Sequence, residues 1–115
     1  MAREFQIDVD QSNDAGVVVV KPLGEVDLAS SPQLRARLTE LIAGHPTRMI
    51  IDLSQVSYMD SSGVATLVEA MQQCRRHSAT LALAELQTRV RSVFEIARLD
   101  TVFDIQDDLE SALKG

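Results

Sequence analysis

The sequence is poor in several residue types, and each shortage excludes a class of protein. Cys74 is its only cysteine, so an internal disulfide and a cysteine-based metal site are both excluded. Aromatic residues make up 3% of the chain, so any core must consist mainly of aliphatic side chains. The longest apolar run, residues 17–20, falls far short of the roughly 18 residues that a membrane span needs.

Positive charge is also scarce. Lysine and arginine number 11 against 17 aspartates and glutamates, which gives a net charge of -6. Nucleic acids and anionic membranes bind basic surfaces, so we expect neither as a direct partner. Residues 1–6 contain no hydrophobic signal region, which favours a cytoplasmic protein.

Short apolar runs alternate with helical patterns along the chain. A length of 115 residues with 45% hydrophobic residues predicts one packed domain over residues 1–115. Strands are predicted near residues 5–9, 17–20 with a continuation through 23–27, 49–53, 80–84 and 102–105. Helices are predicted from about residue 30 to 43, 61–76, 88–97 and 107–114, and residues 12–16 are predicted to form a hairpin turn. This alternation predicts an α/β fold in which helices pack on a mixed sheet.

The stretch 49–71 contains the strand-to-helix transition around which the rest of the predicted fold is arranged. Its apolar run 49–53 leads through a turn and a second short run, 56–59, to Asp60-Ser61-Ser62-Gly63. Apolar residues then recur at 64, 67, 68 and 71, which is helical spacing, and Thr66 falls on the opposite, solvated face. One carboxylate and two hydroxyls therefore lie where a strand passes into a helix N-terminus, and there free N–H groups and the helix dipole favour negative charge.

These four residues each allow a structural interpretation and a functional one. Ser61, taken alone, is most simply a helix N-cap. Asp60 is either the cap or a carboxylate that orients the Ser61 hydroxyl or meets a basic group on a partner. Ser62 supports the first turn, and Gly63 provides turn geometry or allows another backbone to approach closely.

No catalytic constellation is visible. The only histidines are His45 and His77, and a helix rise of 1.5 Å per residue places His77 roughly 24 Å from Ser61. His45 precedes the third predicted strand, at its far end. A nucleophile elbow, a metal-ligand cluster, a phosphate-binding loop and a dinucleotide fingerprint are all missing from the sequence. We therefore expect no enzymatic activity, no cofactor and no metal. We expect the chain to be a substrate of another protein rather than an enzyme.

Three segments, in this order, resemble the STAS domain family, which includes the anti-sigma factor antagonists of bacteria. They are Gly24-Glu25-Val26-Asp27-Leu28-Ala29, Ile51-Asp52-Leu53-Ser54-Gln55-Val56 and Met59-Asp60-Ser61-Ser62-Gly63. The resemblance covers nearly the whole chain. It implies a single STAS domain with a mixed, mostly parallel sheet of about five strands and about four helices packed on it.

The resemblance also implies a switch. In the family, the serine that corresponds to Ser61 is phosphorylated by a cognate serine kinase, which is itself the anti-sigma factor. The unphosphorylated protein sequesters this kinase, phosphorylation releases it, and a PP2C-type phosphatase restores binding. An alternative within the family is a constitutively bound subunit of an ABC-type transporter or of a stress-signalling scaffold.

The predicted docking surface centres on the start of the helix at residue 61, and we expect a monomer. The resemblance adds the loop before the first helix, which neighbours the phosphorylated serine in the family. Tyr58 is a candidate for an apolar rim, and Met59 is assigned to the core. The predicted partner-binding residues are Asp60, Ser61, Ser62, Gly63, Asp27, Ser30 and Tyr58.

Two departures from the family pattern stand out. Val64-Ala65-Thr66 replaces the Leu-Gly run that often follows the glycine. Arg76-His77-Ser78-Ala79 and Ala97-Arg98-Leu99 stand where relatives often have glycine turns. The fold should tolerate both departures, and the first lies beside the predicted docking surface.

Overall fold

The strands form one mixed five-stranded sheet. The computed structural model describes residues 4–11 and 16–115, so most of the turn predicted at residues 12–16 lies outside the described residues. The spatial order β1-β2-β3-β4-β5 is also the order in sequence. β1 (Gln6–Asp10) pairs antiparallel with β2 (Val17–Leu23), whereas β3 (Arg48–Asp52), β4 (Thr80–Ala84) and β5 (Asp104–Gln106) follow β2 in parallel. The predicted α/β fold class and the mostly parallel sheet are confirmed.

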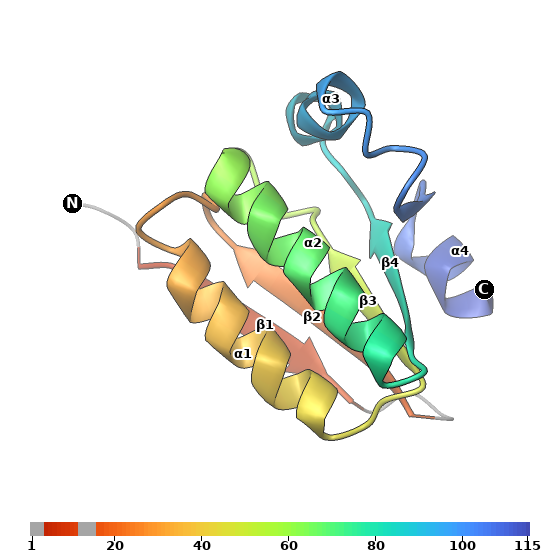
Figure 1. Ribbon diagram of the computed structural model, residues 1–115. Helices are drawn as coiled ribbons and strands as arrows, with labels where there is room; N and C mark the ends of the chain where they lie inside the picture. The colour runs from red at the N-terminus through yellow and green to blue at the C-terminus, as the bar shows by residue number, and fades with distance from the viewer. Residues whose placement is uncertain (1–3, 12–15) are drawn as a thin grey trace.

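Helices lie on both sides of this sheet. α1 (Ser31–Ala43) and α2 (Ser61–Arg76) run side by side over one face, and α4 (Leu109–Lys114) packs on the other (Figure 1). α3 (Thr88–Ile96) lies beyond the end of the sheet at which β4 finishes (Figure 1). Both α1 and α2 connect parallel neighbours, so they point in the same direction.

Alternate residues of the central strands contribute to two separate cores. Met49 and Ile51 of β3 face the larger core beneath α1 and α2, and Ile50 between them faces a smaller core closed by Ala112 of α4. All three β3 residues are fully buried, which explains why this strand is continuously apolar. The buried side chains of α1 recur at helical spacing as Leu34, Leu38 and Ile42.

Two predicted strands have different ends in the structure. β2 stops at Leu23, because Gly24 bends the chain away with a φ of 122°, so the predicted continuation of the strand holds for Leu23 and is wrong for residues 24–27. β5 begins at Asp104 and not at residue 102. Phe103 instead inserts into the core and meets Phe94 edge to face, with ring centroids 5.4 Å apart.

Thr66 corrects the prediction for the outer face of α2. The helical pattern predicts Thr66 on the solvated side, but in the structure it is 1% exposed. α1 packs beside α2 at this level, and Thr66 Oγ1 donates a hydrogen bond to the Ser62 carbonyl at 2.9 Å. A threonine whose hydroxyl is bonded to its own helix can be buried without an unsatisfied polar atom.

Three helices end in a non-glycine residue with left-handed backbone geometry. His45 after α1, Ser78 after α2 and Arg98 after α3 have φ angles of 58°, 60° and 58°. Each N–H still donates to a carbonyl of the preceding helix, as in a glycine-terminated helix. Side chains in this conformation cost roughly 1–2 kcal/mol. Ser78 and Arg98 therefore keep the geometry of the glycine turns while lacking the glycine.

Replacing Ser78 by glycine should stabilise the protein. The Ser78→Gly variant relieves the left-handed strain but adds flexibility to the unfolded chain, so we expect a net gain of about 0.5–1 kcal/mol in the free energy of unfolding by urea titration. Ser92→Gly is the matched control, because Ser92 lies within α3 and the same change there should destabilise by about 0.5 kcal/mol. A loss of stability in Ser78→Gly would contradict the assignment.

Candidate functional site

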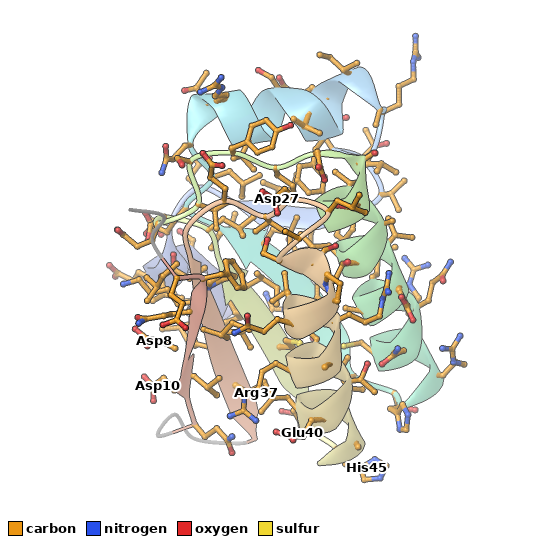
Figure 2. The ribbon with its side chains drawn as sticks, turned by 90° about the vertical axis from the view of Figure 1, so that its left-hand side faces the viewer. Asp8, Asp10, Asp27, Arg37, Glu40 and His45 are labelled. Atoms are coloured by element: carbon orange, nitrogen blue, oxygen red, sulfur yellow. The ribbon has the colours of Figure 1, made fainter. Side chains whose placement is uncertain are left out.

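The candidate site lies at the carboxyl edge of the parallel strands. β2 and β3 both end there, and residues 24–30 and 53–60 carry the chain from these strands into α1 and α2. Asp27 marks this end of the molecule in Figure 2, and His45 marks the opposite end. The carboxyl edge of an open α/β sheet is where such folds generally bind their ligands.

Backbone hydrogen bonds join the two loops into one platform. The Val26 N–H donates to the Tyr58 carbonyl at 2.9 Å, and the Asp60 N–H donates to the Val26 carbonyl at 3.1 Å. These two bonds form a parallel bridge between Val26 and Met59, and a further bond runs from the Gly24 N–H to the Gln55 carbonyl. The start of α2 is thereby fixed relative to the loop that precedes α1.

Gly63 makes this close approach possible. A Cβ atom at this position would lie 2.7 Å from Met59 Cγ, 2.8 Å from Val26 Cγ1 and 3.1 Å from the Val26 carbonyl oxygen. These distances are shorter than van der Waals contact, so any side chain would push α2 away from the platform. Gly63 itself is buried, so it shapes the surface from beneath.

Asp60 is the N-cap of α2. Its Oδ1 accepts hydrogen bonds from the Ser62 N–H at 2.9 Å, the Gly63 N–H at 3.3 Å and the Ser62 hydroxyl at 2.5 Å. The Ser62 hydroxyl is the main cause that lowers the pKa of the Asp60 carboxyl; partial burial opposes it, and backbone N–H groups of Gly63, Ser62 and Leu28 assist. The cap predicted for Asp60 is confirmed, whereas the alternative that Ser61 is the N-cap is wrong.

Ser61 is therefore left outside the cap. It is the first residue of α2, its side chain is exposed, and its hydroxyl has no hydrogen-bond partner among the described residues. The proposed orientation of this hydroxyl by Asp60 is also wrong, because the carboxylate binds the half-buried Ser62 instead. The structure thus separates the two serines: Ser62 completes the cap and Ser61 faces solvent.

Asp27 and Ser30 hold the neighbouring loop in shape. Asp27 Oδ1 accepts from the Ala29 and Ser30 N–H groups, both at 3.0 Å, and Ser30 Oγ donates to the Glu25 carbonyl at 2.7 Å. Ser30 is 8% exposed and sits at the N-cap position of α1, although its side chain makes no capping bond to that helix. Both residues are near the candidate site, as predicted. Their side-chain oxygens bond to backbone groups of the same loop.

The surface around Ser61 is apolar and acidic. Leu28 is 77% exposed and Tyr58 is 37% exposed, one from each loop of the platform, while Met59 is buried as predicted. Leu28 was missed, because a single leucine in a polar loop gives no periodic signal. Residues 24–30 and 53–63 contain three acidic residues near the surface and no lysine or arginine: Glu25, Asp27 and Asp60.

Larger metal-ligand clusters and membrane-spanning helices are not found in the described part of the chain. Residues 4–11 and 16–115 hold no group of three or more His, Cys, Asp or Glu side chains that could bind a metal ion. Within the same residues, no helix combines the length and the apolar character needed to cross a membrane. Burial raises the pKa of the Cys74 thiol to about 11, so this cysteine is a poor nucleophile.

Known proteins share both this sequence pattern and this fold. Residues 6–112 match the family described as the STAS domain. The anti-sigma-B factor antagonist of Bacillus subtilis is 32% identical over 110 residues, which cover 96% of this chain and 100% of that protein. A crystal structure of an anti-sigma factor antagonist from Mycobacterium paratuberculosis has a TM-score of 0.87 at 25% identity and covers 96% of this chain and 92% of its own.

A further structure shares the fold at lower identity. The Bacillus cell fate determinant SpoIIAA, in its phosphorylated form, has a TM-score of 0.71 at 23% identity. The likeness covers 92% of this chain and 96% of SpoIIAA. All four comparisons extend over nearly the whole chain.

Adding a methyl group at Gly63 should destabilise the protein. We expect Gly63→Ala to lower the free energy of unfolding by about 1–3 kcal/mol, because the new Cβ clashes with Met59 and Val26. Urea titration measures the loss, and a double-mutant cycle with Val26→Ala tests its cause. The double variant should lose less than the sum of the two single variants, and strict additivity would argue against the clash.

The cap predicts a specific dependence on pH. Asp60→Ala should lower the free energy of unfolding by about 1 kcal/mol at pH 7. The carboxyl pKa is lowered in the folded state, so its contribution is complete above the unfolded pKa of about 3.9 and is lost as the pH falls through the folded pKa. The difference between wild type and variant, measured by urea titration from pH 7 to pH 3, should therefore shrink below about pH 4. A constant difference over this range would contradict the role of the carboxylate.

Proposed function

This chain belongs to the STAS domain family, and we propose that it is an anti-sigma factor antagonist whose binding is switched by phosphorylation of Ser61. One observation carries the proposal: the Ser61 hydroxyl is exposed and has no hydrogen-bond partner among the described residues, whereas the neighbouring Asp60 and Ser62 are bonded to each other. The similarity to the Bacillus subtilis anti-sigma-B factor antagonist over 96% of the chain supports the class of protein. SpoIIAA, which shares the fold, occurs in a phosphorylated form.

Ser61 is suited to accept a phosphoryl group and not to catalyse a reaction. In the transfer, Ser61 Oγ would attack the γ-phosphorus of ATP, ADP would leave, and a base would take the hydroxyl proton. Asp60 is engaged by Ser62, and both histidines lie beyond the far end of α2, about 24 Å away. The base must therefore come from the kinase.

The phosphoryl group would change the surface without disturbing the fold. It adds about -1.5 to -2 charges, which the positive end of the α2 dipole tolerates. The N–H groups of Ser62 and Gly63 are already bonded to Asp60, and the two loops supply no lysine or arginine. The added charge would find no basic partner within these two loops and would lie at the surface beside Asp60.

A partner bound at this surface would then be released. The partner we propose is an anti-sigma factor that is also the serine kinase, and a PP2C-type phosphatase would restore binding. An interface formed on the unmodified Ser61 would have to accommodate both extra bulk and an unpaired double charge. Desolvating such a charge at the centre of an interface costs several kcal/mol, which is enough to separate the complex.

The proposed docking surface follows from exposure. Ser61 and Tyr58 can contact a partner directly, and exposed Leu28 adds apolar area beside them. Asp60 and Ser62 fix the direction of the helix start. The buried members of the predicted set, Gly63 and Ser30, act by bringing the two loops together and by shaping them.

Variants of Ser61 test the switch. We expect Ser61→Ala to bind the kinase captured from an extract of the host as tightly as wild type but to accept no phosphate from ATP. Ser61→Asp should weaken binding at least tenfold, which corresponds to about 1.4 kcal/mol, because it places a charge at the interface. Calorimetric titration measures affinity, and mass spectrometry counts phosphoryl groups.

Ser62→Ala is the matched control. It removes the neighbouring hydroxyl, so it should remain a substrate while losing some stability from the cap. Equal partner affinity for wild type, Ser61→Ala and Ser61→Asp would reject the switch. If the captured partner were an ABC-type ATPase or a signalling scaffold held equally by all forms, the alternative of a constitutive subunit would replace it.

A further inference from the structure

A pair of histidines lies at the end of the molecule opposite Ser61. His77 is the C-cap of α2, and His45 directly follows Gly44, the C-cap of α1. Their ring centroids are 5.1 Å apart, with an angle of 59° between the ring planes. They are the only two histidines of the chain, and both are exposed.

The topology of the sheet brings them together. α1 connects β2 to β3 and α2 connects β3 to β4, and because these strands are parallel, both helices end at the same edge. His45 adopts the left-handed conformation with a φ of 58°, in which a side chain is normally disfavoured. The chain therefore places one imidazole at the end of each of two adjacent helices. His45 occupies the left-handed position where glycine is usual, and His77 directly precedes such a position at Ser78.

The spacing of the two rings is compatible with binding of one metal ion by both. Imidazole nitrogens bind zinc at about 2.0–2.1 Å, so two imidazoles on adjacent positions of one ion have their ring centres about 5 Å apart. The observed separation of 5.1 Å already matches this value. Both side chains are exposed, so an ion can reach them and complete its coordination with water.

The charges near the two histidines both favour and oppose the binding of a cation. The C-terminal ends of α1 and α2 carry partial negative charge and point to the same edge, which favours a cation. Arg75 and Arg76 in the last turn of α2 oppose it, but they are exposed, so solvent and salt screen their repulsion. With only two protein ligands, the site should bind and release its ion readily.

We propose that His45 and His77 form a binding site for a divalent transition-metal ion of the Zn²⁺, Ni²⁺ and Cu²⁺ class, for which imidazole is a preferred ligand. The ion would bridge the ends of α1 and α2. The two residues come together only in the folded chain, so binding would also raise the stability of the protein. This site is independent of the proposed switch at Ser61.

Zinc titration of the tag-free full chain tests the site. Calorimetry with ZnCl₂ should show one bound ion, and the imidazole proton resonances of the two histidines should shift together with the same zinc dependence. His45→Gln and His77→Gln should each weaken zinc binding at least tenfold, and the remaining histidine in each variant should no longer shift at the concentration that half-saturates wild type.

The controls separate a shared site from independent surface histidines. Gln72→Ala changes an exposed residue of the same helix and should bind zinc like wild type. Melting temperatures without zinc should show that both histidine variants remain folded, since the replaced side chains are exposed. A loss of less than tenfold in either variant, resonances that titrate at different zinc concentrations, or no binding by wild type would each overturn the proposal.

Discussion

The contact between Gly63 and Val26 is the constraint on which the candidate site depends. Because Gly63 has no side chain, the first turn of α2 lies against the loop that precedes α1, and the backbone bridge between Val26 and Met59 can form. That bridge fixes Asp60 at the start of the helix. Asp60 then caps α2 through Ser62 and Gly63, and only Ser61 is left to point outward.

Much of this arrangement could be predicted from the sequence, because it is encoded locally. The β-branched run in β2 and the apolar run in β3 predict buried strands, and the spacing after Gly63 predicts α2. The choice between Asp60 and Ser61 as the cap could not be predicted. It depends on which residue adopts the extended backbone before the helix, and in the structure this is Asp60, with φ and ψ of -105° and -172°. Both residue types are good caps, so composition does not decide between them.

The features that the sequence did not reveal depend on contacts between distant segments. Thr66 is buried because α1 lies beside it, and no pattern within α2 shows which side α1 will cover. His45 and His77 are 32 positions apart in the sequence, and only the parallel direction of the two helices brings their rings within 5.1 Å. Leu28 is an isolated apolar residue whose exposure follows from the shape of a loop. These features can be predicted only when the order of the strands in the sheet is known, because that order decides which distant residues lie side by side.

The division of labour between Asp60 and Ser61 also bears on how such a protein can evolve. Asp60 carries the cap, so most substitutions at that position lose stability and are removed by selection before their effect on a partner matters. The Ser61 side chain is exposed and its hydroxyl has no hydrogen-bond partner among the described residues, so a change there should leave the folded state nearly as stable as before. If Ser61 is the switch that we propose, selection at residue 61 acts mainly on recognition. Paralogous copies of the domain could diverge in what they signal through that single position while inheriting an unchanged fold.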